Sequence, residues 1–329
     1  MRPFAYARAS SAGDAVATLA QHPRGAFLAG GTNIVDLIKI DVAMPDALID
    51  INALPLAQIA AERDGRIRIG ALARMSDTAD HPLVRHAAPV LSQALNLSAS
   101  PQLRNMASIG GNVLQRTRCV YFRDVSQPCN KRRNGEGCSA IGGDDRKMAI
   151  LGASDRCIAT HPSDFAVAML VTDATIHVQG PNGDRATPFV GFHRLPGDDP
   201  TRDTNLNPGE LIVALSFAPS DVTRRSAYVK VRDRASYEFA LVSAAAGIDV
   251  RNGVIRDVRI GLGGVAHAPW RAKLAEAALV GKPATNASFV AAAEDELRAA
   301  KPQRLNGFKV ALARNAMVRA LGIAARGAA

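Results

Sequence analysis

The sequence predicts an α+β protein built from two or three packed units, and three observations lead to this prediction. Its 329 residues exceed what a single hydrophobic core usually holds. Short apolar runs typical of strands alternate with helically spaced segments through residue 97. Extended patterns return between residues 174 and 262, and the last 60 residues, rich in Ala, Leu and Arg, have a helical pattern. A domain boundary is expected near Asp221–Arg225, which would divide the chain into residues 1–222 and 223–329.

The first 97 residues are expected to contain strands and helices in alternation. After an opening strand, Ser11 is a candidate N-cap with Asp14 three residues further on, which predicts a helix. The remaining predictions for this part are a strand over Ala26–Ala29, a glycine turn over Gly30–Asn33, a helix over Ile34–Ile40, strands over Leu48–Ile51 and Ile67–Ala71, and mostly helix over residues 76–97.

A long polar segment, residues 104–161, separates the two halves of the chain and is rich in Gly, Arg, Asn and Cys. A loop of this length with little periodicity is usually functional. Beyond it, the pattern predicts a helix over Phe165–Val171, strands over Ala174–Val178, Leu211–Phe217, Tyr228–Val231, Ala240–Val250 and Val254–Leu262, and turns at Asn182–Gly183 and Asn252–Gly253.

The composition excludes several classes of function. Apolar residues make up 47% and charged residues 21%, which is typical of a globular protein. No apolar run reaches about 18 residues, so no membrane insertion is expected. The first residues lack the pattern of a secretory signal, so the chain should stay in the cytoplasm or leave it folded on a partner. The net charge of +10 comes without a basic stripe or tail, and aromatics are only 5%, so no nucleic-acid partner is expected.

Two glycine loops indicate a ligand that carries phosphates. The first is Ala29-Gly-Gly-Thr-Asn33, and the second is Ser108-Ile-Gly-Gly-Asn112, about 80 residues later. Paired glycines let the main chain come close to a ligand, and the N–H groups of such turns bind anions. A purely structural strand-to-helix turn would look similar. The first loop is neither a dinucleotide fingerprint, because the third glycine is missing, nor a P-loop, because no Gly-Lys-Ser/Thr follows.

All four cysteines lie within 39 residues, at Cys119, Cys129, Cys138 and Cys157. An iron–sulfur cluster needs four thiolates and tolerates wide spacing in an irregular loop. Buried thiols, two disulfides and a zinc site are the alternatives, although zinc sites normally show close C-x₂₋₄-C pairs. Basic residues surround the first cysteines and would suit an anionic centre; they are Arg116, Arg118, Arg123, Lys131, Arg132 and Arg133.

These motifs together resemble the FAD-binding subunits of the xanthine dehydrogenase family of molybdenum hydroxylases. The resemblance covers almost the whole chain and includes Leu48-Ile-Asp-Ile51, Ile69-Gly-Ala71, Tyr228-Val-Lys-Val-Arg-Asp-Arg-Ala-Ser236 and Gly261-Leu-Gly-Gly-Val-Ala266. It implies an FAD-binding domain of the PCMH type with two α/β subdomains, over residues 1–222. An α+β domain of the CO dehydrogenase flavoprotein type would follow over residues 223–329.

The cysteine-bearing segment is similar to an insertion in the flavoprotein subunits of bacterial periplasmic aldehyde oxidoreductases. The similar runs are Leu114-Gln-Arg-Thr-Arg-Cys119, Gln127-Pro-Cys-Asn-Lys131 and Cys157-Ile-Ala-Thr-His-Pro-Ser-Asp164. The resemblance implies that the four cysteines hold a [4Fe–4S] cluster in an insertion at about residues 115–160. It also implies a heterotrimer with a molybdenum-cofactor large subunit and a small subunit that carries [2Fe–2S] clusters. Electrons would pass through FAD to an external acceptor.

The resemblance also assigns roles to individual residues. The FAD pyrophosphate would lie against Ala26, Phe27, Leu28, Ala29, Gly30, Gly31, Thr32, Asn33, Ile34, Ser108, Gly110, Gly111 and Asn112. Asp164 would bind the ribityl or ribose part of FAD, unless it only caps the helix that follows. Lys230 would lie near the isoalloxazine ring, unless it is a solvated strand residue. Arg104 and Arg118 are further candidates as partners of the phosphates or the cluster. No residue of this chain is expected to be catalytic.

Three other interpretations remain open at this point. The flavin subunit could serve an aromatic acyl-CoA reductase or a xanthine dehydrogenase-like enzyme instead of an aldehyde oxidoreductase. A DNA-binding redox sensor could also use an iron–sulfur cluster, but it would not need the glycine loops.

The cellular compartment is expected to follow from the partner subunits. The resemblance implies that the chain is exported already folded, as a passenger of a complex with a twin-arginine signal; the alternative is that it stays in the cytoplasm.

Overall fold

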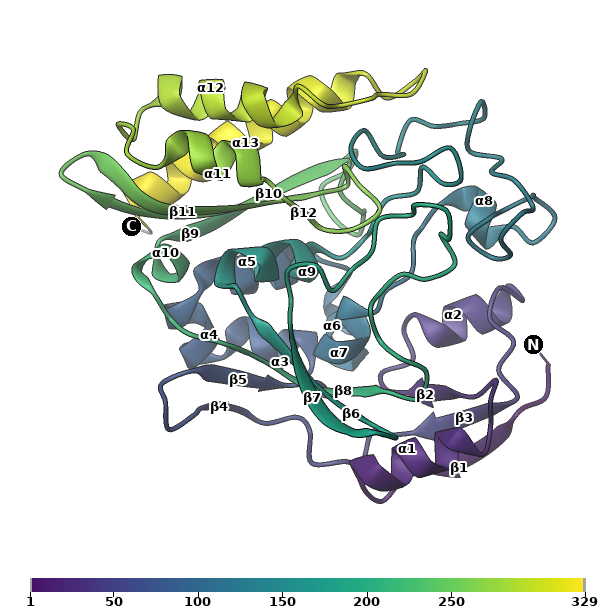
Figure 1. The fold of residues 1–329 in the computed structure, drawn as a ribbon. Helices are drawn as coiled ribbons and strands as arrows, with labels where there is room; N and C mark the ends of the chain where they lie inside the picture. Colours follow the sequence, from purple (N-terminus) through teal and green to yellow (C-terminus); the bar gives the residue numbers. More distant parts are fainter. Residues whose placement is uncertain (1, 328–329) are drawn as a thin grey trace.

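The computed structural model describes residues 2–327, which form three β-sheets with helices between and above them (Figure 1). The α+β fold predicted from the sequence is confirmed. The N-terminal sheet is parallel, in the order β1 (Ala5–Arg8), β3 (Ala47–Asp50), β2 (Ala26–Leu28). Its connections are α1 (Ala12–Ala20) and α2 (Ile34–Lys39). The predicted cap of α1 is confirmed, since the Ser11 side chain accepts a hydrogen bond from the Asp14 N–H.

The second sheet is antiparallel and contains strands from both sides of the long polar segment. Its order is β4 (Ile59–Ala61), β5 (Ile67–Gly70), β8 (Leu211–Phe217), β6 (Thr175–Gly180), β7 (Gly183–Pro188). The helices on this sheet are α3 (Met75–Asp80), α4 (Pro82–Ala87), α5 (Pro89–Leu97), α6 (Pro101–Met106), α7 (Ile109–Val113) and α9 (Asp164–Met169). Buried side chains such as Leu91, Phe165 and Phe217 join sheet and helices into one core.

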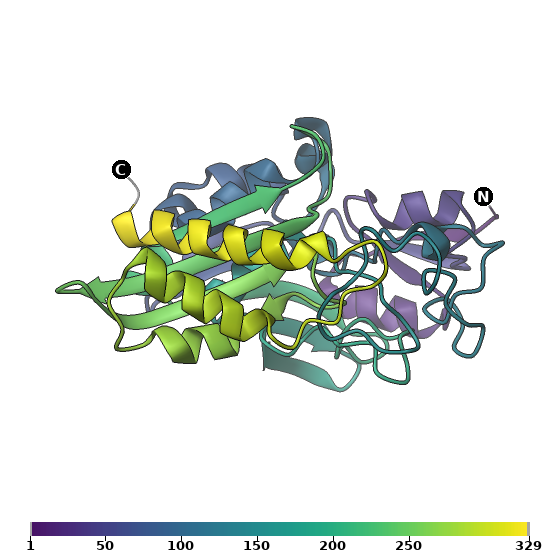
Figure 2. The ribbon, with the colours of Figure 1, turned by 90° about the horizontal axis from the view of Figure 1, so that it is seen from above.

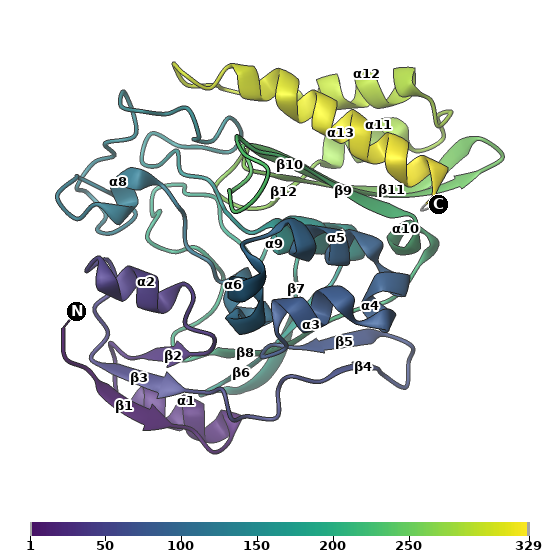
Figure 3. The same cartoon turned by 180° about the vertical axis from the view of Figure 1, so that it is seen from behind.

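The third sheet belongs to the C-terminal part, in the order β12 (Trp270–Arg271), β11 (Val254–Gly263), β10 (Val242–Arg251), β9 (Ser226–Val231). Helices α11 (Lys273–Leu279), α12 (Asn286–Leu297) and α13 (Phe308–Arg326) cover its outer face (Figure 2). Its inner face packs on α5 and α9, which therefore lie between the second and third sheets (Figure 3). The short helix α10 (Asp221–Arg224) precedes β9.

The predicted elements and turns agree with the structure to within a few residues. Both hairpin turns are confirmed, with positive φ at Gly183, Asn252 and Gly253. The sequence patterns gave no indication of the short elements β4, β12, α8 and α10, or of α6 and α7, which lie at the start of the segment where little periodicity is visible. Within residues 2–327, no helix is both long and apolar enough to cross a bilayer.

The cysteine-bearing segment is mostly irregular, as predicted, with one short helix, α8 (Val120–Arg123). It has a small core of its own, in which Phe122, Met148 and Ile158 pack with Cys119, Cys129 and Cys157. Leu37 of α2 belongs to the same core, so the segment rests on the helix that follows the first glycine loop. The fold therefore places the cysteines next to α2.

A buried lysine of α13 forms a hydrogen bond with the C-terminal part of this segment, at Met148. The Lys309 ammonium is inaccessible to solvent and donates hydrogen bonds to the carbonyls of Met148 (2.7 Å) and Gly264 (2.5 Å). Burial, with a smaller contribution from Arg146, lowers the pKa of Lys309 from 10.5 to about 7.

This shift predicts a pH dependence of stability. Between pH 7 and 10.5 the unfolded chain binds a proton at Lys309 that the folded chain does not, so stability should rise with pH in this window. We expect the Tm of the wild type to rise relative to that of Lys309→Met as pH increases from 7 to 9. Parallel Tm curves for the two proteins would contradict the assigned pKa.

Candidate functional site

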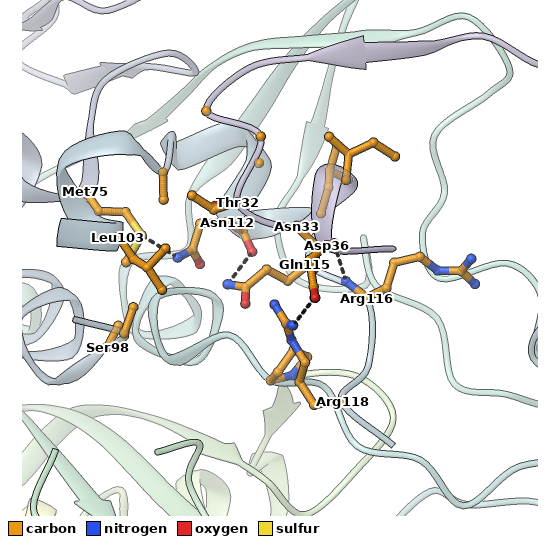
Figure 4. A pocket seen from close by; sticks show the side chains of 18 of the residues that line it. Thr32, Asn33, Asp36, Met75, Ser98, Leu103, Asn112, Gln115, Arg116 and Arg118 are labelled. Atoms are coloured by element: carbon orange, nitrogen blue, oxygen red, sulfur yellow. Dashed lines mark hydrogen bonds and ion pairs between the residues drawn. The ribbon is translucent and has the colours of Figure 1, made fainter. Parts of the chain in front are cut away.

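A cleft of about 720 Å³ lies between the glycine loops, the cysteine-bearing segment and the β9–β10 connection. Such a volume is typical of sites for small molecules and cofactors. Thr32 and Asn33 of the first loop and Asn112 of the second lie near the middle of the lining residues in Figure 4. Ser98 and Leu103 lie toward one end, and Asp36 and Arg118 toward the other (Figure 4).

The first glycine loop connects β2 to α2 and needs both of its glycines. Gly31 has a φ of +74°, which side chains with a Cβ rarely adopt. A Cβ on Gly30 would lie 1.9 Å from the Met106 carbonyl oxygen, at the end of α6. Gly30 is therefore required for the close packing of the segment before the second glycine loop, in addition to any approach to a ligand.

Asn33 leaves an unused donor at this loop. It is the first residue before α2, but its side chain does not cap the helix. Its Oδ1 accepts a hydrogen bond from the Arg116 N–H at 3.4 Å, while its Nδ2 is buried with no partner among the described residues. A buried amide N–H₂ without a partner is costly, so a ligand oxygen in the cleft would satisfy it.

The second glycine loop begins α7. The Ser108 hydroxyl caps this helix by accepting from the Gly111 N–H at 3.3 Å. A Cβ on Gly110 would press on Ala71, whereas one on Gly111 would meet only the Ser108 hydroxyl. The Asn112 side chain is already occupied: its Nδ2 donates to the Met75 sulfur, and its Oδ1 accepts from the Ser163 hydroxyl.

Most of the residues predicted to bind the cofactor line this one cleft. They are Phe27, Ala29, Gly30, Gly31, Thr32, Asn33, Ile34, Ser108, Gly111, Asn112 and Asp164. Ala26 and Leu28 belong to β2 and are not among the lining residues, and neither is Gly110, which packs on Ala71. The contacts of all these residues with FAD stay predictions.

Asp164 is the centre of a buried polar cluster at one end of the cleft. Its carboxylate accepts from the Tyr228 hydroxyl at 2.6 Å, the Lys230 ammonium at 2.8 Å and the Ser98 hydroxyl at 3.0 Å. Burial, together with the Asp164 charge, raises the pKa of Tyr228 well above 10, so its hydroxyl stays a donor. Asp164 does not cap α9, because the Ser163 hydroxyl does so.

Lys230 is buried, so the interpretation of it as a solvated strand residue is wrong. Its side chain is 1% exposed and bound to Asp164 and to the Leu97 carbonyl. Lys230 does not line the cleft itself. Its ammonium instead holds the carboxylate of Asp164, which does line the cleft. Arg104 is not among the lining residues either, but its guanidinium donates to the carbonyl of Ser98, which lines the cleft, at 2.8 Å.

The four cysteines gather in one part of the molecule. Cys119, Cys129 and Cys157 are buried, Cys138 is partly exposed, and none forms a disulfide within the described residues. Cys129 and Cys138 face each other across a β-bridge. Burial raises the pKa of the Cys119 thiol to about 11 and that of Cys157 to about 12. Within residues 2–327, no three His, Cys, Asp or Glu side chains are arranged to hold a metal ion.

The basic residues around the cysteines are hydrogen-bonded or ion-paired within the chain, and their suitability for an anionic centre stays a prediction. Arg118 and Arg123 both bind Asp36, while Arg116 and Lys131 both bind Asp203. Arg132 donates to the carbonyls of Tyr121, Phe122 and Gln127, and Arg133 pairs with Glu136. The sequence did not indicate Asp36 and Asp203, because nothing in a single chain marks which carboxylates will face a basic loop.

Lys131 and Asp203 belong to a buried network that the sequence did not reveal. The Lys131 ammonium also contacts the Nε2 of His267 at 2.7 Å, and the His267 Nδ1 lies 2.9 Å from the Arg194 carbonyl. Burial alone would raise the pKa of Asp203, but Lys131 and Arg116 outweigh it and lower the pKa to about 2. Burial and Lys131 lower the pKa of His267 to about 4, so it is neutral. This network joins the cysteine-bearing segment to the loop before β8.

Replacing Gly30 with alanine tests the packing between the two glycine loops. Because the Cβ would collide with main-chain atoms, we expect a cost of about 2–3 kcal/mol and a lower Tm. The matched control is Gly13→Ala in α1, where the Cβ meets only the Ser11 hydroxyl at 3.9 Å. The control should be neutral or stabilising by up to about 1 kcal/mol. Equal Tm values for the two variants would contradict the packing described.

Comparison with known proteins agrees with this architecture. Residues 2–219 match the model of the FAD-binding domain in molybdopterin dehydrogenase, and residues 226–324 match the CO dehydrogenase flavoprotein C-terminal domain. The chain is 45% identical to the aldehyde oxidoreductase FAD-binding subunit PaoB of Escherichia coli, over 98% of each chain. It is 27% identical to a putative xanthine dehydrogenase FAD-binding subunit, XdhB, of the same organism, over 91% of this chain and 86% of that one.

A solved structure shows the same fold. A chain of the carbon monoxide dehydrogenase from Hydrogenophaga pseudoflava superimposes with a TM-score of 0.77 and 28% identity, with 100% of both chains covered. The resemblance inferred from the sequence motifs is thereby confirmed. The chain belongs to the family of FAD-binding subunits of the molybdenum hydroxylases.

Proposed function

We propose that this chain is the FAD- and [4Fe–4S]-containing electron-transfer subunit of a heterotrimeric molybdenum-dependent aldehyde oxidoreductase. The observation that carries this proposal is the convergence of both glycine loops on one cleft beside a segment that holds four cysteines. The 45% identity to an aldehyde oxidoreductase subunit over the whole chain supports the aldehyde class over a xanthine dehydrogenase-like enzyme, whose subunit is 27% identical.

The residues present fit an FAD molecule in the cleft. The volume is sufficient for a cofactor of this kind, and the main-chain N–H groups of Gly31–Ile34 make no hydrogen bond within the described residues and are available near the middle for a pyrophosphate. The N–H groups of Ile109–Asn112 already donate within the chain, so the second glycine loop contributes the wall of the cleft rather than free main-chain donors. The unused Nδ2 of Asn33 supplies a further donor. Asp164, held in place by Lys230 and Tyr228, presents a carboxylate that accepts from a ribityl hydroxyl. When bound, FAD supplies the ability to take up and release electrons, while these residues bind and orient it.

The flavin in this proposal is held without a covalent bond. The described residues that line the cleft include no histidine or cysteine, the usual points of flavin attachment. We therefore predict one FAD per chain that acid precipitation releases completely into the supernatant. Flavin fluorescence of the supernatant and of the pellet measures this, and flavin that stays with the pellet would contradict it.

Three features support a [4Fe–4S] cluster at the cysteines. The thiols are unpaired and share one small core, and the segment around them is irregular enough to wrap a centre. A single zinc ion would draw four sulfurs to about 3.8 Å from each other, given a Zn–S bond of about 2.3 Å. In a four-iron cube each thiolate binds a different iron, so the ligands surround a larger body. The four cysteines also lack the close C-x₂₋₄-C pairs that zinc sites normally show, and this spacing favours the cluster over zinc.

Single changes of the cysteines test the cluster. Each of Cys119→Ser, Cys129→Ser, Cys138→Ser and Cys157→Ser should remove most of about four irons and four sulfides that this chain contributes. Iron and sulfide are measured in the anaerobically purified complex, against a wild-type complex prepared in parallel. Zinc in stoichiometric amount, or iron retained in all four variants, would contradict the proposal.

The partners in this proposal are the other two subunits of a molybdenum hydroxylase. A large subunit carries the molybdenum cofactor and the aldehyde site, and a small subunit carries the [2Fe–2S] clusters. Electrons reach FAD through these subunits and leave to an external acceptor. This division of roles among three subunits fits the groups in the cleft of this chain. They bind and orient a cofactor, and the one buried carboxylate among the described lining residues, Asp164, is paired with Lys230.

The compartment follows from the partners as well. We propose that the assembled complex is exported folded, by a twin-arginine signal on the small subunit, so that the chain works in the periplasm. Cell fractionation should find the chain in the periplasm when all three subunits are expressed together, and in the cytoplasm when it is expressed alone. Periplasmic chain without its partners would overturn this part of the proposal.

A further inference from the structure

Arg118 lies where three parts of the molecule meet. It directly precedes Cys119 in the chain and lines the cleft. Its Nη1 donates to the Asp36 carboxylate of α2 at 2.8 Å, and its guanidinium carbon lies 5.1 Å from the centre of the Phe239 ring, in the β9–β10 connection. Arg118 thus belongs to the cysteine-bearing segment and contacts both the helix after the first glycine loop and the β9–β10 connection.

Asp36 does not fully neutralise the positive charge of Arg118. Arg123 already binds both oxygens of the same carboxylate, at 2.8 Å and 2.9 Å. Two guanidinium groups therefore share one carboxylate, which leaves one positive charge in excess at this end of the cleft. In a half-buried position such an excess favours an anionic ligand.

Arg118 also has a donor that nothing in the described chain uses. Its Nε is buried and has no hydrogen-bond partner within residues 2–327. The Arg118 side chain is only 24% exposed, so water solvates its guanidinium incompletely, which is costly for a cation. A ligand oxygen at the Nε would satisfy the donor and offset that cost.

The position of Arg118 indicates which part of the cofactor it meets. Asp164 and Ser98 are hydrogen-bonded to each other and lie at the opposite end from Arg118, with the glycine loops between (Figure 4). If Asp164 takes the ribityl chain and the loops take the pyrophosphate, the adenosine half of FAD extends toward Asp36 and Arg118.

We propose that Arg118 binds the ADP half of FAD and that, through it, the cysteine-bearing segment controls the affinity for the flavin. The proposal rests on the proposed function, because it requires FAD in this cleft. Arg118 is fixed in the chain by Cys119, whose N–H donates to the Thr117 hydroxyl and whose side chain is buried in the cysteine core. Loss of order at Cys119 therefore moves Arg118 away from the cofactor.

The first experiment compares FAD with FMN, which lacks the adenosine half. In the flavin-depleted complex, Arg118→Met should raise the Kd for FAD by about 10- to 100-fold, the effect of losing one charged hydrogen bond, and leave the Kd for FMN unchanged. If FMN binds too weakly to titrate, the Ki of ADP as a competitor of FAD should rise instead. Arg133→Met is the matched control, because Arg133 lies in the same segment but is 82% exposed and pairs with Glu136.

The outcomes separate this proposal from the proposed function. A wild-type complex that binds no FAD overturns the proposed function. Normal FAD affinity in Arg118→Met, or an equal loss for FAD and FMN, overturns the role of Arg118. If Arg118→Met does not assemble, Arg118→Lys keeps a cation for Asp36 and removes the Nε, and it should still weaken FAD binding several-fold and spare FMN.

A double-mutant cycle tests the coupling to the cysteines. Cys119→Ser should weaken FAD binding in the wild-type background and cause little further loss in the Arg118→Met background. Independent effects, in which the two changes in Kd multiply, would show that the cysteine-bearing segment does not act on the flavin through Arg118.

Discussion

The contact between the two loop regions at Gly30 is the constraint on which the rest of the site depends. The Cα of Gly30 packs against the Met106 carbonyl, on the side where any other residue would carry its Cβ. Met106 ends the helix that leads into the second glycine loop. Only glycine, which has no Cβ, allows the two main-chain segments to approach each other so closely. The contact brings α2 and α7 to the same cleft from parts of the chain about 80 residues apart, and it thereby sets the separation of the two glycine loops.

The cysteine-bearing segment depends on the same frame. It rests on Leu37 of α2, its arginines bind Asp36 of the same helix, and Lys131 ties it to Asp203 and His267 on the other side. Of these cations, Lys131 is 1% exposed, so the loss of Asp203 would leave a buried charge without its carboxylate and would be strongly destabilising. The segment is therefore a rigid neighbour of the flavin cleft, although it contains almost no regular secondary structure.

The sequence predicts the parts of this site that depend on local chemistry. Paired glycines, strand and helix periodicity, and the turns at Asn182–Gly183 and Asn252–Gly253 all depend on neighbours in the chain, and these predictions agree with the structure. The carboxylates that pair with Arg116, Arg118 and Lys131 lie 72 to 87 positions away in the chain, so these ion pairs could not be foreseen. Lys230 also shows this limit, since only the fold brings its ammonium onto Asp164.

The most direct test of the account is an experimental structure of the assembled complex with anomalous data at the iron edge. The account predicts the FAD pyrophosphate between Gly30–Asn33 and Ser108–Asn112, and a compact four-iron peak enclosed by Cys119, Cys129, Cys138 and Cys157. A flavin bound outside this cleft, or a zinc-edge signal at the cysteines without iron, would contradict it.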